Sequence, residues 1–152
     1  MVPVMAMLSL DQHLCFALYS ASRAMTAAYR PVLAEMRLTY PQYLVMLVLW
    51  EDRSVTVGRL GERLHLDSGT LSPLLKRLEA NGFVRRERSL TDERLVEVTL
   101  TDAGRELEGR AQCIPEQIFS ATGMTEHDAA DLRDTVRQLN DALNASLRKE
   151  TA

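Results

Sequence analysis

The residues that could carry nucleophilic, redox or metal chemistry are few: two cysteines and three histidines in 152 residues. A reactive cysteine beside a histidine could serve a thiol peroxidase or a hydrolase. His13 lies two residues from Cys15, so on a helix the two side chains face different directions. His65 and His127 show no spacing relation to either cysteine, and there is no Cys-x-x-Cys or glycine-rich phosphate loop. We therefore expect no enzyme, no metal site and no other cofactor.

Cys15 and Cys113 are too few for a disulfide scaffold and are thiols by default in a reducing compartment. Cys15 falls in a segment whose Leu14, Leu18 and Met25 share one helical face. A cysteine on such a face is usually a small buried hydrophobe. Spacing alone favours that interpretation, and leaves a sensing thiol as the alternative.

A basic segment in the middle of the chain offers chemistry suited to DNA. Residues 53–94 hold nine Lys and Arg against six acids, a charge of +3. The whole chain carries −3, so −6 remains outside this segment. A basic centre between acidic flanks favours a nucleic-acid surface on an acidic scaffold.

Two short helices with a tight connection are predicted in this segment. Val57, Leu60 and Leu64 recur at helical spacing, residues 66–69 connect, and a second apolar stripe ends at Asn81-Gly82. This pattern is typical of a helix-turn-helix. The second helix either starts near Thr70 or bends at Pro73. Its polar face supplies candidate contacts to bases and phosphates: Ser68, Thr70, Ser72, Lys76 and Arg77.

After Gly82 the apolar period changes from 3.6 to 2, which predicts strands over 83–88 and 94–100 with a turn at 89–93. A hairpin directly after the second helix is a wing. Arg94 and Asp92 share one face of its tip, where an arginine can enter a minor groove or form an ordinary salt bridge. Arg86, on the first strand, is a further candidate DNA contact.

Amphipathic helices flank this winged unit, which spans about residues 37–100. A capping box of Ser9 and Gln12 predicts a helix that Pro31 ends or restarts, and residues 43–50 predict a buried helix. Further helices follow between 101 and 148, capped at Thr101-Asp102 and Thr125 and interrupted at Pro115. The fold class is mainly α with a small β-hairpin wing, in one domain over 1–152. We expect 9–36 and 101–148 to be dimerisation helices that space two winged units roughly 34–36 Å apart.

No apolar run approaches a membrane span, and residues 1–8 lack the basic region of a signal peptide. The expected location is the cytoplasm, with no membrane partner.

The stretch from Asp92 to Gly104 (Asp-Glu-Arg-Leu-Val-Glu-Val-Thr-Leu-Thr-Asp-Ala-Gly) is similar to the wing signature of the MarR family of regulators. It follows Leu71 to Gly82 (Leu-x-x-Leu-Leu-x-x-Leu-x-x-x-Gly), as that family requires. The resemblance covers about residues 9–148. It implies a winged-helix homodimer that binds a pseudo-palindromic double-stranded DNA operator.

The N-terminal third resembles the organic hydroperoxide resistance regulators through Leu-Cys-Phe-Ala-Leu-Tyr-Ser at 14–20, Tyr29, and Leu-Thr-Tyr-Pro-Gln-Tyr at 38–43. In that subfamily a first-helix cysteine senses peroxide, and two tyrosines hydrogen-bond its sulfur. Cys15, Tyr29 and Tyr40 fall on those positions, with Tyr19 nearby. A thiolate there attacks the peroxide O–O bond and becomes a sulfenic acid. No helix-dipole contribution is expected, since Cys15 lies beyond the first turn after Ser9.

The resemblance implies a repressor that leaves its operator when an organic hydroperoxide oxidises Cys15. Two-cysteine members carry a resolving cysteine in the helix after the wing, which forms a disulfide with the partner's sensor. Cys113 is the candidate, although that position is expected nearer Phe119 or Ser120; otherwise a small thiol caps Cys15. The alternative function is a MarR-type repressor released by a small aromatic ligand.

Overall fold

The structure is a computed structural model that describes residues 9–150, so the expectation of no signal peptide at residues 1–8 lies outside the described residues. The chain divides into two compact units, Met1–Ile114 and Pro115–Ala152. Among the described residues, no helix is long and apolar enough to span a bilayer.

The first long helix begins later than its sequence suggests. A short 3-10 helix, η2 (Leu10–Gln12), precedes α1 (Leu14–Ala34). The capping box expected at Ser9 is wrong, because the Ser9 side chain makes no capping bond. His13 caps α1 instead, its Nδ1 accepting from the backbone N–H of Phe16 at 3.2 Å. Cys15 is therefore the second residue of α1.

Pro31 neither ends nor restarts the helix, contrary to expectation, because α1 continues through it to Ala34. A proline removes one backbone hydrogen bond, and this close to the helix end little further helix remains to be disrupted. The ring is exposed, whereas Leu33 just beyond it is fully buried. Burial of Leu33 favours continuation of the helix past Pro31.

α2 (Tyr40–Asp52) is the buried helix that the sequence predicts. Thr39 and Gln42 form a reciprocal capping box, and Pro41 lies in the first turn, where its missing N–H costs nothing. Most of its apolar side chains lie in the core: Tyr43, Val45, Met46, Val48, Leu49 and Trp50.

The helix-turn-helix consists of α3 (Val57–Leu64) and α4 (Ser68–Ala80). His65, in left-handed conformation at φ 55°, ends α3, and the Asp67 carboxylate caps α4 by accepting from the Thr70 N–H at 2.7 Å. The connection is shorter than the predicted 66–69, and α4 starts before Thr70. Pro73 therefore lies in the second turn of α4, and the helix continues past it.

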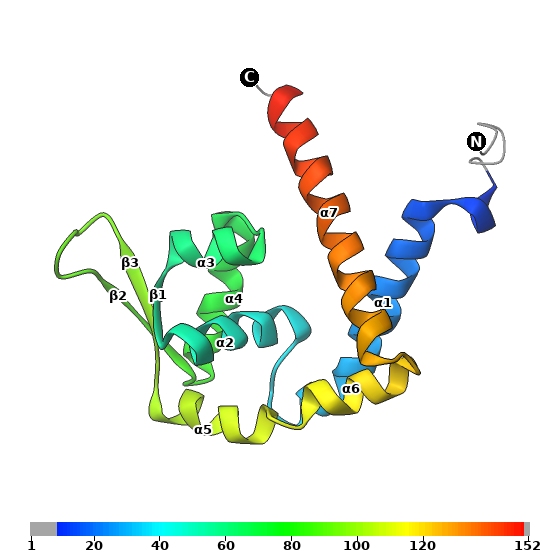
Figure 1. Cartoon of the computed structure of the whole chain (residues 1–152). Helices are drawn as coiled ribbons and strands as arrows, with labels where there is room; N and C mark the ends of the chain where they lie inside the picture. The colour runs from blue at the N-terminus through cyan, green and yellow to red at the C-terminus, as the bar shows by residue number, and fades with distance from the viewer. Residues whose placement is uncertain (1–8, 151–152) are drawn as a thin grey trace. The chain divides into compact units, whose positions relative to one another are not determined.

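A three-stranded antiparallel sheet in the order β1-β3-β2 completes the winged unit. Its strands are β1 (Ser54–Thr56), β2 (Val84–Arg88) and β3 (Val96–Leu100). The predicted hairpin is confirmed, although Arg94 and Leu95 belong to its loop and not to β3. β1 was not predicted. Figure 1 shows the β2–β3 hairpin extending beyond the neighbouring helices.

α5 (Asp102–Ala111) follows β3, with Thr101 as its N-cap, and α6 (Ile114–Thr122) begins after two residues. The break predicted at Pro115 is confirmed, and it places Cys113 in the connection and not on a helix. Gly123 turns the chain at φ 67° before α7 (Glu126–Glu150), and Thr125 caps α7 through the Asp128 N–H. Much of the α7 apolar stripe is exposed: Leu132, Val136, Leu143 and Leu147.

Candidate functional site

α4 presents two different faces. Leu71, Leu75 and Leu78 are buried against the rest of the winged unit. The five residues predicted to contact DNA all lie exposed on this helix: Ser68, Thr70, Ser72, Lys76 and Arg77. Hydroxyl groups near the start of the helix and two cations further along suit base edges and phosphates, respectively.

The wing tip holds Arg94 against Asp92 in a two-point ion pair. Arg94 Nε lies 3.0 Å from Asp92 Oδ1, and Nη2 lies 3.0 Å from Oδ2. The Arg94 N–H also donates to Asp92 Oδ1 at 3.1 Å. These hydrogen bonds lower the pKa of Asp92, so the carboxylate stays charged and orients the guanidinium. The structure thus brings these two predicted residues together on a projecting loop.

Arg86 has a different environment. Its Nε and Nη2 donate to Glu79 Oε2 at 3.1 and 2.9 Å, and its backbone N–H donates to Glu79 Oε1 at 3.1 Å. One carboxylate on α4 therefore holds both backbone and side chain of β2. Sequence reasoning missed this contact, which fixes the wing to the helix-turn-helix. A DNA contact by Arg86 stays a prediction.

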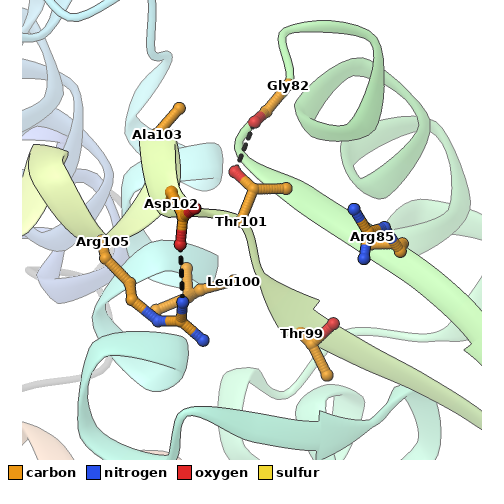
Figure 2. Close-up of a pocket in the computed structure, with 8 residues that line it drawn as sticks. All are labelled: Gly82, Arg85, Thr99, Leu100, Thr101, Asp102, Ala103 and Arg105. Carbon is orange, nitrogen blue, oxygen red and sulfur yellow. Dashed lines mark hydrogen bonds and ion pairs between the residues drawn. The ribbon is translucent and has the colours of Figure 1, made fainter.

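The base of the wing is a dense junction between β2, β3 and α5. Thr101 Oγ1 donates to the Gly82 carbonyl and accepts from the Gly104 N–H at 3.1 Å. Figure 2 shows Thr101 bonded to Gly82 beside the Asp102–Arg105 ion pair, at a shallow pocket of about 490 Å³. A β-carbon on Gly104 would lie 2.1 Å from the carbonyl oxygen of Phe83, so α5 lies close against the backbone of the residue that precedes β2.

Both thiols are accessible in the single chain. Cys15 lies in the first turn of α1, where backbone N–H groups lack helical partners and favour negative charge. The expectation that Cys15 lies beyond the first turn of its helix is therefore wrong, because it placed the helix start at Leu10. Tyr19, one turn later, lies under the Arg23 guanidinium, 5.6 Å from its ring centre. Cys113 Sγ donates only a long contact of 3.9 Å to the Arg110 carbonyl.

Three tyrosine rings, here called the phenol cluster, pack together between α1 and α2. Tyr29 and Tyr40 have ring centres 4.8 Å apart, and Tyr43 lies 5.6 and 6.3 Å from them. Sequence reasoning named the first two and missed Tyr43, although its spacing of three from Tyr40 places both on one helical face. Burial raises the pKa of all three phenols, that of Tyr43 to about 12. The hydroxyls therefore remain protonated and able to donate.

Cys15 and the phenol cluster do not meet within one chain. Fourteen residues of continuous helix separate Cys15 from Tyr29, which at 1.5 Å per residue is about 21 Å. Tyr40 packs against Tyr29 and is remote as well. Of the predicted tyrosines, only Tyr19 lies on the same stretch of α1 as Cys15, at the helical spacing of four.

A helix-turn-helix with a polar second helix, followed by a hairpin with an oriented arginine at its tip, defines a winged-helix DNA-binding protein. Residues 27–109 match the family model of the SarA/Rot transcriptional regulators. The chain belongs to this family of MarR-type winged-helix transcriptional regulators.

Similar proteins agree with this assignment. The HTH-type transcriptional regulator TtmR of Methylorubrum extorquens is 53% identical, over 90% of this chain and 70% of TtmR. The organic hydroperoxide resistance transcriptional regulator of Bacillus subtilis is 43% identical, over 90% of this chain and 93% of that protein. The structure of reduced AbfR bound to DNA superposes with a TM-score of 0.72 at 37% identity, over 91% and 96% of the two chains. AbfR of Staphylococcus epidermidis is also known in a disulfide form and, overoxidized, bound to DNA.

Proposed function

We propose that the chain is a cytoplasmic, peroxide-sensing repressor that binds its operator as a homodimer and releases it when Cys15 is oxidised. One observation carries the redox part: the accessible thiol sits in the first turn of α1, about 21 Å along the helix from phenols on the same chain. Only a second copy can bring phenols such as Tyr29 and Tyr40 to this sulfur.

The proposed dimer is supported by apolar surface that a single chain leaves uncovered. α1 and the segment before it expose five large apolar or aromatic side chains: Leu10, Leu14, Phe16, Tyr19 and Met25. The exposed stripe of α7 adds a second surface of the same kind. Large exposed apolar patches mark interaction sites, and a twofold pair would bury both surfaces at once. Residues 9–36 and 101–148 are the proposed dimerisation segments.

The proposed chemistry is stoichiometric. The Cys15 thiolate attacks one peroxide oxygen of an organic hydroperoxide, so an S–O bond forms and the O–O bond breaks. The electron pair leaves with the alkoxide, which takes a proton and departs as an alcohol. Phenol hydroxyls from the partner donate to the thiolate before the reaction. The sulfenic acid then condenses with a thiol and releases water; that thiol is the partner subunit's Cys113 or a small free thiol.

The DNA-binding part combines α4 with the wing. Ser68, Thr70 and Ser72 face base edges, while Lys76 and Arg77 neutralise phosphates. Arg94, oriented by Asp92, enters the minor groove beside this site. Oxidation breaks the contact between sulfur and phenols, shifts the helices and moves the wings off the operator. The protein consumes one peroxide per thiol and is not an enzyme.

Two relatives support the redox proposal over release by an aromatic ligand. The Bacillus subtilis relative is named for organic hydroperoxide resistance. AbfR, which is 35–39% identical to this chain, is known in reduced, disulfide-formed and overoxidized states, so thiol chemistry occurs in that relative.

The test is operator binding by reduced protein before and after one equivalent of cumene hydroperoxide, on DNA selected from a random pool by reduced protein. Wild type should release the DNA, and Cys15→Ser should stay bound. Cys113→Ser is the matched control, because it removes the other exposed thiol and leaves the proposed sensor intact.

Release by Cys15→Ser would refute the sensor assignment. A wild type that ignores peroxide would favour the aromatic-ligand alternative. If Cys113→Ser releases DNA only when a small thiol is added, Cys113 is the resolving cysteine.

A further inference from the structure

A line of buried contacts runs from the phenol cluster to the base of the wing, and it starts at Tyr43. This residue is 2% exposed and packs against both Tyr29 and Tyr40. Its other neighbour is Trp50, two helical turns further along α2, with ring centres 6.1 Å apart and planes at 65°. An edge-to-face pair of this kind is directional, so one ring cannot tilt freely without the other.

Trp50 makes the next connection. Its indole Nε1 donates to the Gly104 carbonyl at 2.9 Å, in a buried hydrogen bond that joins α2 to the first turn of α5. An indole has one N–H and no acceptor, so it holds the carbonyl at a fixed distance and direction. Breaking the bond would leave a buried donor unsatisfied, which is costly. Tyr43 and Gly104 are thus linked through a single side chain.

Gly104 lies in tight contact with the base of the wing. Backbone contact with Phe83 leaves no room for a β-carbon on Gly104. Thr101 reinforces the junction, because its N–H donates to the Phe83 carbonyl at 3.1 Å and its hydroxyl donates to the Gly82 carbonyl. Figure 2 shows this junction at the point where the chain leaves Gly82 for β2. Two residues into β2, Arg86 is held by Glu79 of α4.

We propose that Trp50 is a positioning residue that transmits displacement of the phenol cluster to the wing through Gly104. This inference rests on the proposed function and states how one event at the thiol would reach the DNA. Close-packed side chains are hardly compressible. A displacement of the tyrosine rings therefore moves the next rigid element that they contact. The next rigid element is the α5–wing junction.

The chain supplies its own probe, because Trp50 is the only tryptophan. We expect one equivalent of cumene hydroperoxide to change the wavelength or intensity of Trp50 emission in wild type. The same addition should leave the emission of Cys15→Ser unchanged. A wild type that releases its operator with no change in Trp50 emission would overturn the proposal while leaving the sensing function intact.

Two substitutions test the link by function. The quantity measured is the ratio of operator Kd after oxidation to operator Kd when reduced. Trp50→Phe keeps a ring and removes the N–H donor; we expect this ratio to fall on the order of tenfold, with reduced-state Kd close to wild type. Tyr43→Leu should lower the ratio similarly, and Tyr43→Phe, which restores the ring, should recover it.

Val48→Ala is the matched control, since it truncates a buried side chain on α2 outside this line of contacts. Its ratio should remain that of wild type. Equal ratios in wild type and Trp50→Phe would refute the role of Trp50. If Tyr43→Leu does not fold, Trp50→Phe and the emission experiment still decide. No release by wild type would remove the proposed function and this inference with it.

Discussion

Arg94 and Asp92 are joined at the wing tip by two hydrogen bonds of 3.0 Å, while 88% of the Arg94 side chain remains exposed. A solvent-exposed ion pair of this kind contributes little to stability. Its effect is to orient a cation that projects into solvent. The pair therefore matters for binding and not for folding.

We accordingly expect Arg94→Ala to weaken operator binding by about 1–3 kcal/mol with an unchanged melting temperature. Asp92→Asn should weaken binding less, because the cation remains but loses its orientation. Fluorescence anisotropy titrations at fixed salt measure both. Arg105→Ala is the control, since it removes an exposed cation from α5. If Arg94→Ala and Arg105→Ala behave alike, Arg94 does not contact DNA.

The two glycines of α3 should respond oppositely to the same change. A β-carbon on Gly61 would lie 2.7 Å from the Leu66 carbonyl oxygen and 3.2 Å from Leu71, whereas nothing lies within 4 Å of one on Gly58. Gly61→Ala must push apart the α3–α4 connection, and we expect a loss of about 1–3 kcal/mol and weaker DNA binding. Gly58→Ala should stabilise by up to about 1 kcal/mol. Urea denaturation checks both signs.

Alkaline pH should lower the free energy of unfolding, because Tyr43 is buried. Burial raises its pKa from 10.0 to about 12, so the fold favours the neutral phenol. The stability from this phenol is complete below pH 10 and is lost as pH rises to about 12. We expect the free energy of unfolding to fall less over this range in Tyr43→Phe than in wild type. A fall in Tyr43→Phe as steep as that in wild type would contradict this account.

Acid should loosen the contact between α4 and the wing. Hydrogen bonds from Arg86 lower the pKa of Glu79 below its ordinary 4.5. The stability it provides is therefore present above pH 4.5 and is lost as pH falls below it. Glu79→Gln should cost about 0.5–1 kcal/mol at neutral pH, after solvent screening, and nothing in acid. Chemical denaturation at both pH values measures this, with exposed Glu62→Gln as a control that should have little effect.

Elements fixed by their own local chemistry could be predicted from sequence. α2 was predicted from its apolar run over 43–50, and the α5–α6 break from Pro115. The wing was found from its change of period. In the site, the exposed polar face of α4 and the Asp92–Arg94 pair followed from helical and hairpin spacing, since both depend on neighbours in sequence.

Features that depend on distant contacts were missed. β1 has three residues and is a strand only because it pairs with β3, more than 40 residues away. α1 passes through Pro31 because Leu33 is buried. The start of α1 was misplaced because a histidine caps it in place of a serine. The apolar run over 43–50 predicted burial of Tyr43 and Trp50, but the partners of Tyr43, Trp50 and Glu79 lie on other elements of the fold and could not be read from the sequence.

The continuous helix between Cys15 and Tyr29 has a consequence for mixed assemblies. Under the proposed function, Cys15 of each subunit contacts the phenols of the other subunit. Oxidation of Cys15 in one chain therefore displaces the phenol cluster, and then the wing, of the opposite chain. A heterodimer of wild type with a cysteine-free copy would then retain one working sensor. In that heterodimer, the wing that leaves the DNA first would belong to the cysteine-free chain.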